Sequence, residues 1–96
     1  MHDLCFPLIF LNKAKERWNS KKTELTTLFT TTAQAQFTEL SDNAKVNFDR
    51  WQILGTYVWP NAAGYQNRTT YESECQYLTD WMQKRIDWMD SAVSGL

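Results

Sequence analysis

The stretch that decides the fold runs from Thr69 to Asp90 and reads TTYESECQYLTDWMQKRIDWMD. Thr69, followed three residues later by Glu72, matches a capping box, in which a hydroxyl and a carboxylate each pair with an orphan backbone amide at a helix start. The pattern therefore predicts a helix that begins at about Thr70 and covers residues 70–93.

The apolar side chains of this predicted helix fall in two stripes. At roughly 100° per residue, the first stripe is narrow, as expected for the buried face of an amphipathic helix. Its members are Tyr71, Cys75, Leu78, Met82, Ile86, Met89 and Val93. Tyr77, Trp81 and Trp88 form the second stripe, about a quarter turn away, with Arg85 between the two. Because one neighbour cannot cover both stripes, we expect the helix to be covered on two sides.

On the remaining, solvated face of the same helix, Asp80 and Lys84 have the spacing of an i, i+4 ion pair. Upstream, the periodicity predicts helices at about 7–19, 23–40 and 42–51. Pro7 suits a first helical turn, the first helix should end near Asn19 and Ser20, and Thr23 and Ser41 are good N-caps for the next two. The second helix is rich in threonine, a poor helix former, so we expect it to depend on tertiary packing.

The predicted fold class is thus mainly α, a single small domain of three to four helices with one long irregular loop at 52–69. Gly55, Pro60 and Gly64 mark this loop, while Tyr57, Trp59 and Tyr65 make it unusually apolar. Loops of this length in a small domain usually belong to a function or pack against something else. Two interpretations stay open: the rings cover the local helices, or they dock on a part of the protein outside this chain or on a ligand.

Composition limits the classes of partner. The chain has 96 residues, 43% of them hydrophobic and 15% aromatic, with a formal net charge of −1 and both signs mixed along the sequence. This balance offers no electrostatic footprint for nucleic acid or anionic lipid. The longest apolar run, Leu4 to Leu11, is too short to span a bilayer and lacks the flanks of a signal peptide. We therefore predict no nucleic-acid partner, no membrane span and no export signal.

No catalytic set can be assembled from the sequence. His2, the sole histidine, is read as a solvated tail residue, and Cys5 and Cys75 as two small buried apolar residues rather than a disulfide. The pattern holds no two carboxylates together for acid–base work. We predict no catalytic, cofactor-binding or metal-ligating residue in this chain.

Several aromatic elements recur in a characteristic order. They are Lys15-Glu16-Arg17-Trp18, Asn47-Phe48-Asp49-Arg50-Trp51, Leu54-Gly55, Tyr57-Val58-Trp59-Pro60-Asn61, Tyr71-Glu72-Ser73-Glu74, Tyr77-Leu78, Trp81, Arg85 and Trp88-Met89-Asp90. In order and spacing, over most of the chain, they resemble the C-terminal end of spore-coat protein H (CotH) family kinases.

The resemblance implies the C-terminal helical portion of an atypical, kinase-like, ATP-dependent and metal-dependent protein kinase that is envelope-associated, spore-coat or secreted. Phosphoryl transfer needs a residue on the phosphates, acidic metal ligands and a group that orients the nucleophile. None of these can be placed here, and with only three glycines the chain has no Gly-rich loop. The catalytic residues, ATP and divalent metal of such a kinase would lie upstream, and a Met1 start ahead of the first matched helix fits a truncated or split reading frame or an excised fragment.

Two functional hypotheses follow. In the first, the chain is a non-catalytic segment that supports or docks to the missing catalytic lobe or another protein. In the second, it is a free-standing binding module whose loop aromatics hold a sugar or peptide. An independent enzyme is the third and weakest interpretation. The residues expected at an interaction surface, through which the chain could also self-associate, are Tyr57, Trp59, Tyr65, Tyr77, Trp81, Arg85 and Trp88.

Overall fold

The computed structural model describes the backbone of residues 2–96 and the side chains of residues 7–96. The predictions made for His2 and Cys5 therefore lie outside the described side chains. The elements in chain order are α1 (His2–Thr27), the π-helical segment η1 (Leu28–Thr32), α2 (Ala33–Glu39), α3 (Ser41–Arg50), the short 3-10 helix η2 (Tyr65–Asn67) and α4 (Tyr71–Ser94). The described residues contain no β-strand, so the mainly α fold class with one long loop is confirmed.

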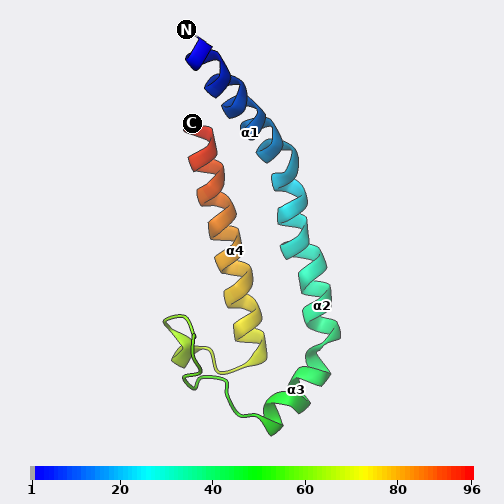
Figure 1. Cartoon of the computed structure of the whole chain (residues 1–96). Coiled ribbons are helices and arrows are strands. Elements are labelled where there is room, and N and C mark those ends of the chain that lie inside the picture. The colour runs from blue at the N-terminus through cyan, green and yellow to red at the C-terminus, as the bar shows by residue number, and fades with distance from the viewer. Residues whose placement is uncertain (1) are drawn as a thin grey trace.

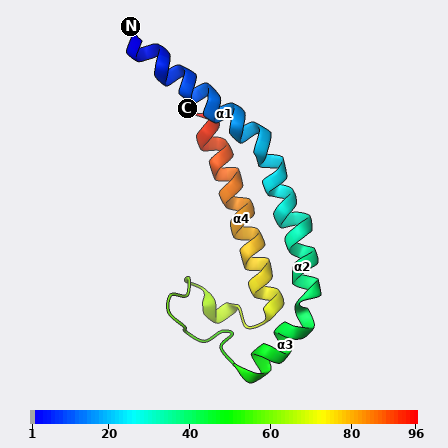
Figure 2. The ribbon, with the colours of Figure 1, turned by 45° about the vertical axis from the view of Figure 1, so that its right-hand side comes forward.

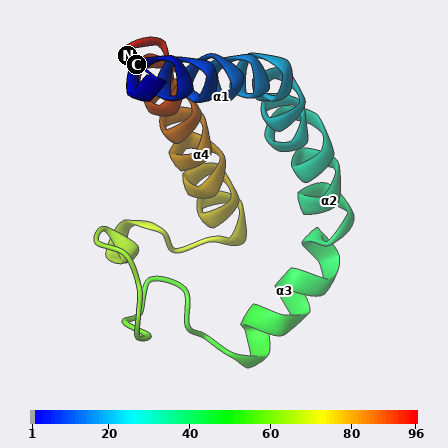
Figure 3. The same cartoon turned by 45° about the horizontal axis from the view of Figure 1, so that its top comes forward.

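The architecture is a long helical hairpin. α1, η1 and α2 follow one another without a break and form one curved structure, here called the long arm, and α4 runs back beside it (Figure 1). The start of α1 and the end of α4 lie toward the same end of the hairpin, and α1 extends past the end of α4 (Figure 2). At the other end α3 and the loop leave the line of the two long helices (Figure 3).

Two of the predicted helix boundaries in the long arm are wrong. α1 continues through Asn19 and Ser20, and Pro7 lies inside it. The Ser20 hydroxyl donates to the Arg17 carbonyl at 2.9 Å instead of ending the helix. Continuing the helix keeps Trp18 and Lys22 on one face, since residues four apart lie one above the other, and both reach the same carboxylate on α4.

The predicted cap at Thr23 is also absent, and threonine hydroxyls bond back to the helix instead. Thr27 donates to the Thr23 carbonyl at 3.0 Å, and Thr26 and Thr30 bond in the same i to i−4 way. Such bonds satisfy the hydroxyls without breaking the helix, although they often bend it. The wider π-helical turn follows directly, closed by the Ala33 amide on the Leu28 carbonyl.

The threonine-rich segment is tied to α4 by a side-chain hydrogen bond. The Gln34 amide nitrogen donates to the Phe29 carbonyl at 3.3 Å and to the Thr79 hydroxyl at 2.8 Å. The Tyr71 hydroxyl donates to the Phe37 carbonyl at 3.1 Å, and burial, followed by its contact with Cys75, raises the pKa of this phenol. The bonds from Gln34 to Thr79 and from Tyr71 to Phe37 join α4 to the far end of the long arm.

α3 differs from its prediction at both ends. Leu40, not Ser41, occupies the N-cap position, and it makes no side-chain capping bond. Trp51, the last residue of the helix predicted at 42–51, is its extended C-cap residue and is 57% exposed. The helix therefore ends one residue before its predicted end.

The core of the hairpin is thin. Among the described hydrophobic residues only Trp18 and Ile86 are buried. The radius of gyration is 19.0 Å, whereas a compact chain of this length has about 13 Å. The accessible surface is 7793 Å², roughly 2,000 Å² more than the roughly 5,700 Å² expected for a compact monomer of 11.3 kDa. The chain thus leaves uncovered an unusually large area for its size.

Candidate interaction surfaces

The predicted inner stripe of α4 does face the long arm, with one exception. Ile86 is buried, and Tyr71, Cys75, Met82, Met89 and Val93 are half-buried. Leu78 is 44% exposed, so its place in the core was wrongly predicted. It lies at the edge of the stripe, where the single neighbouring helix does not reach.

Asp90 holds α4 and α1 together at the end of the hairpin opposite α3. Its carboxylate oxygen accepts the Trp18 indole N–H at 2.9 Å and the Lys22 ammonium at 3.0 Å. The indole hydrogen bond, and after it the lysine, hold the pKa of Asp90 below its ordinary value of 3.8. The hydrogen bond between Trp18 and Asp90 joins two of the recurring aromatic elements, Arg17-Trp18 and Trp88-Met89-Asp90, which lie far apart in the sequence. Sequence reasoning missed this role of Asp90, because the pairing spans 72 residues.

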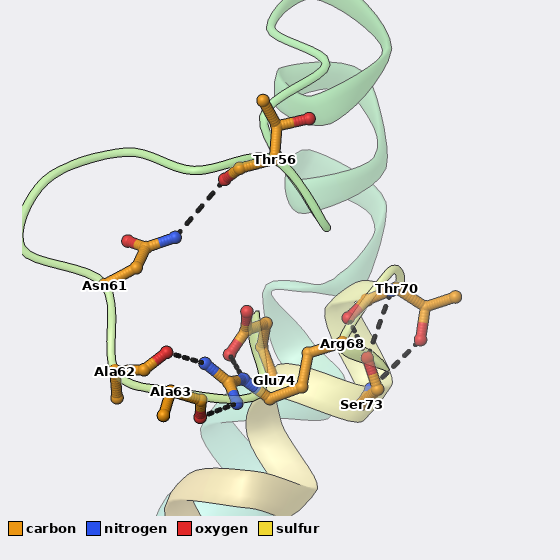
Figure 4. A network of polar contacts seen from close by, with 8 residues as sticks. All are labelled: Thr56, Asn61, Ala62, Ala63, Arg68, Thr70, Ser73 and Glu74. Atoms are coloured by element: carbon orange, nitrogen blue, oxygen red, sulfur yellow. Dashed lines mark hydrogen bonds and ion pairs between the residues drawn. The ribbon is translucent and has the colours of Figure 1, made fainter. Parts of the chain in front are cut away.

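A second polar centre fixes the loop to the foot of α4, and we call it the Arg68 clasp. Arg68 is 8% exposed. Its guanidinium donates from Nε to Glu74 at 3.0 Å and from its two terminal nitrogens to the Ala63 and Ala62 carbonyls at 3.3 and 3.4 Å (Figure 4). Its planar fork suits several acceptors at once. Arg68 is not among the site residues predicted from the sequence. The one sequence signal that could have indicated it is its position just before the start of α4.

The same arginine links the loop to the predicted aromatic surface. Its guanidinium carbon lies 4.0 Å from the centroid of the Tyr77 ring. Gly64 precedes η2 with φ of +88°, a conformation that a side chain would strain. A Cβ there would also stand 3.3 Å from an Arg68 nitrogen. The Arg68 clasp and Gly64 therefore together determine the path of the backbone from the loop into α4.

The cap of α4 lies one residue later than predicted. Thr70, extended at φ −127° and ψ 158°, is the N-cap residue. Its hydroxyl accepts the Ser73 amide at 3.0 Å, and the Ser73 hydroxyl accepts the Thr70 amide at 3.1 Å. The predicted box of Thr69 with Glu72 is therefore wrong, although the predicted helix start is nearly correct. The sequence holds two threonines in a row, and only the backbone decides which of them is extended.

The seven residues predicted at an interaction surface separate into two groups. Tyr57, Trp59 and Tyr65 lie in the loop, where the Tyr57 and Tyr65 rings pack against each other with centroids 5.6 Å apart. Trp59 is 79% exposed. The Asn61 side chain donates to the Thr56 carbonyl at 3.3 Å, which steadies the turn that carries Trp59 (Figure 4).

The second group forms what we call the outer face of α4, made of Tyr77, Trp81, Arg85 and Trp88. The three rings are 37%, 50% and 59% exposed, in that order. By helix geometry they lie roughly 140° to 180° around the axis from Ile86, so the predicted quarter turn between the two stripes was too small, and the rings face away from the long arm. The Arg85 guanidinium lies 4.5 Å from the Trp88 ring centroid. α4 therefore has two apolar sides, as expected. The long arm covers the inner side, and the outer side is exposed to solvent.

Two arginines lie over tryptophan rings. The guanidinium carbon of Arg50 is 5.3 Å from the Trp51 ring centroid, and that of Arg85 is 4.5 Å from the Trp88 ring centroid, whereas Arg17 and Trp18 form no such pair within the described residues. Trp18 is instead buried against α4. The predicted ion pair between Asp80 and Lys84 is also absent, because Asp80 accepts the Gln76 amide at 2.8 Å.

One groove of about 530 Å³ lies between α3 and the start of α4. Phe48, Leu54 and Tyr71 give it apolar walls, and Asp42 and Glu72 lie at its sides. The described residues contain no group of three or more histidine, cysteine, aspartate or glutamate side chains placed to hold a metal ion. None of the described helices is long and apolar enough to cross a membrane.

Comparison with protein-family models, with curated proteins and with solved structures found no match.

Proposed function

We propose that this chain is a non-catalytic, C-terminal helical segment of a CotH-like kinase, and that it supports or docks to a catalytic lobe carried by another stretch of polypeptide. The observation that carries the proposal is the uncovered area: 7793 Å² of accessible surface around a core of two buried hydrophobic side chains. A protein interface of standard size buries about 800 Å² per partner. The accessible surface of this chain exceeds that of a compact monomer of the same mass by an area that a permanent protein–protein interface would bury.

The internal bonds support the same function. The bonds of Trp18 with Asp90 and of Arg68 with Glu74 hold α1 and the loop against α4 in one frame, and Trp18, Glu74 and Asp90 belong to the CotH-like elements. These contacts are made within the chain itself, whereas Trp81 and Trp88 lie uncovered on α4. A frame of this kind presents a preformed surface, which lowers the entropy cost of docking. ATP and a divalent metal would be bound by the lobe and by no residue of this chain.

The test is to read the DNA upstream of Met1 and to co-express the catalytic lobe found there with this chain. We expect a complex of one chain with one lobe that survives gel filtration. An upstream region without such a frame, or a lobe that does not bind, contradicts the proposal. Phosphorylation of a protein substrate by the isolated chain with ATP and Mn²⁺ would contradict its non-catalytic role.

A second candidate function follows from the 79% exposure of Trp59 at a loop turn held by Asn61 and Thr56. As a free-standing binding module, the chain would stack this ring on a sugar or peptide, since rigid aromatic side chains supply large contact area at low entropy cost. Tryptophan fluorescence titrated with cell-wall glycans and coat-protein peptides tests it. A signal that Trp59→Ala abolishes supports the module, and a flat titration across the panel rejects it.

A further inference from the structure

The covered face of the long arm changes register at η1. Before and into η1, the buried and half-buried residues recur at the α-helical spacing of three or four between residues 11 and 29, with Trp18 near the centre of the face. Such a face continues along a helix only while each residue adds about 100° of rotation. The residues that follow η1 therefore show whether the helix keeps its register.

The residues of α2 that are covered differ from those that an unbroken α-helix would cover. At about 100° per residue, Gln36 would lie at the centre of the face and Gln34 roughly 150° away from it. Gln36 is exposed, whereas Gln34 and Phe37 are half-buried. The covered face of α2 thus lies one residue later than a continuous α-helix would place it.

The π-helical turn accounts for this shift. Its backbone bonds join residue i+5 to residue i, so the turn holds one residue more than an α-helical turn. In η1 the Ala33 amide bonds in this way to the Leu28 carbonyl. One additional residue changes which side of the following helix faces α4 by roughly 100°. The change expected from one π-turn and the change observed in the covered face are the same.

The rotation brings α2 into hydrogen-bonding contact with α4. Gln34 Nε2 donates to the Thr79 hydroxyl on α4 at 2.8 Å and to the Phe29 carbonyl inside the turn at 3.3 Å. One side chain therefore braces both the turn and the contact that the turn makes possible. Because α3 and the loop continue from α2, the same turn affects the direction in which they leave the hairpin (Figure 3).

We propose that η1 is a register shift built into the long arm, in which one residue of the run Thr30–Thr32 is surplus to an α-helix and directs α2, α3 and the loop relative to α4. This shift is independent of the proposed function, because every contact concerned lies within this chain. Removing one residue from the run should give an unbroken helix with the same covered face. Adding one residue should turn Gln34 away from α4 by roughly another 100°.

The experiment compares two length variants of the full chain by urea unfolding followed by circular dichroism. Deletion of Thr31 should leave the unfolding constant within about twofold of that of the unchanged chain, because Gln34 and Phe37 keep their places against α4. Insertion of one alanine after Thr31 is the matched control, with the opposite change at the same position. It should raise the unfolding constant by about 30-fold or more, or prevent folding, because the contacts of α2 with α4 are lost together.

Gln34→Ala gives a second measurement, which reports the side of α2 that faces α4. In the unchanged chain and in the Thr31 deletion it should raise the unfolding constant by about fivefold, the effect of losing one hydrogen bond. In an insertion variant that folds, it should have almost no effect, since Gln34 no longer reaches Thr79.

Three outcomes contradict the register shift. Equal destabilisation by the deletion and the insertion overturns it, because η1 would then be required at its present length. Two variants as stable as the unchanged chain also overturn it, because the register of α2 would not depend on this turn. A stable deletion variant in which Gln34→Ala has no effect overturns it as well, since another side of α2 would then face α4.

Discussion

The two faces of α4 have opposite surroundings. On the inner face Trp18 of the long arm is 9% exposed, and its indole N–H bonds to Asp90 at 2.9 Å. On the outer face Trp88 is 59% exposed and lies under Arg85 at 4.5 Å. The inner tryptophan has an acceptor for its N–H and a neighbouring helix for its ring, whereas the outer one has only a cation. The difference teaches that the inner face holds the hairpin together and the outer face is available to a partner.

The largest expected effect comes from removing Trp18, which packs against the inner face of α4, in comparison with removing Trp88 from the outer face. Trp18→Ala should cost about 3 kcal/mol of unfolding free energy, because it empties a buried site and leaves the Asp90 carboxylate with fewer donors. Trp88→Ala should cost about 0.5 kcal/mol, the loss of an exposed cation–π contact. Urea unfolding followed by circular dichroism measures both. Equal losses would place Trp88 in the core of this chain and remove the contrast between the faces.

The Arg68 clasp gives the next largest effect. Arg68→Ala should cost about 2 kcal/mol, since Glu74 and two loop carbonyls lose a charged donor inside a mostly buried site. The exposed Arg50 provides the control, and Arg50→Ala should change the unfolding free energy by less than about 0.5 kcal/mol. Limited proteolysis gives a second measurement, because cleavage between residues 52 and 67 should quicken in Arg68→Ala alone. A loop that stays protected would show that its aromatic packing, rather than the clasp, holds it.

Removing the N-cap of α4 should lower the unfolding free energy by a smaller amount, and the effect should differ between the two neighbouring threonines. Thr70→Ala should cost about 1 kcal/mol, because its hydroxyl accepts the Ser73 amide. Thr69→Ala should be nearly neutral, whereas the capping box read from the sequence alone would make Thr69 the sensitive position. Thermal unfolding of the two variants decides between the positions, at roughly 4 to 8 °C per kcal/mol for a domain of this size.

The smallest effect is the pH dependence of Asp90, because this carboxylate is 41% exposed and solvent screens it. Its pKa is lowered in the folded chain by Trp18 and Lys22, so the unfolded chain binds the proton more readily. Its stabilisation is therefore complete above the ordinary pKa of 3.8 and is lost as the pH falls through the lower folded value. The urea midpoint of the unchanged chain should fall more than that of Asp90→Asn between pH 5 and about pH 3. Parallel profiles would show that other carboxylates set the acid limit.

The sequence predicted the helical class, the loop and the approximate start of α4, because these depend on local periodicity and local turn residues. It failed at the Asn19–Ser20 break and at the Thr23 cap, where local preference favours an end. The helix continues there because Trp18 and Lys22 both reach Asp90, a contact with a residue far along the chain. Single-sequence reasoning has no access to such a pairing.

The candidate site divides in the same way. Tyr77, Trp81, Arg85 and Trp88 could be named from helix periodicity, since a stripe on a helix is a property of spacing alone. Arg68 could not, because its function depends on the loop folding back so that Ala62, Ala63 and Glu74 converge on one guanidinium. The position of an arginine in a loop sequence does not indicate which acceptors the folded loop will bring to its side chain.

By itself, the sequence determined that this protein is helical and that the helix from Tyr71 to Ser94 has two apolar sides, because side-chain direction on a helix follows from position. Only the tertiary structure decided which side is covered by the chain's own long arm and which is left open. The reason is that burial depends on what lies opposite. Asp90 fixes the long arm against one side of α4, and nothing in the described chain lies opposite Trp81 and Trp88.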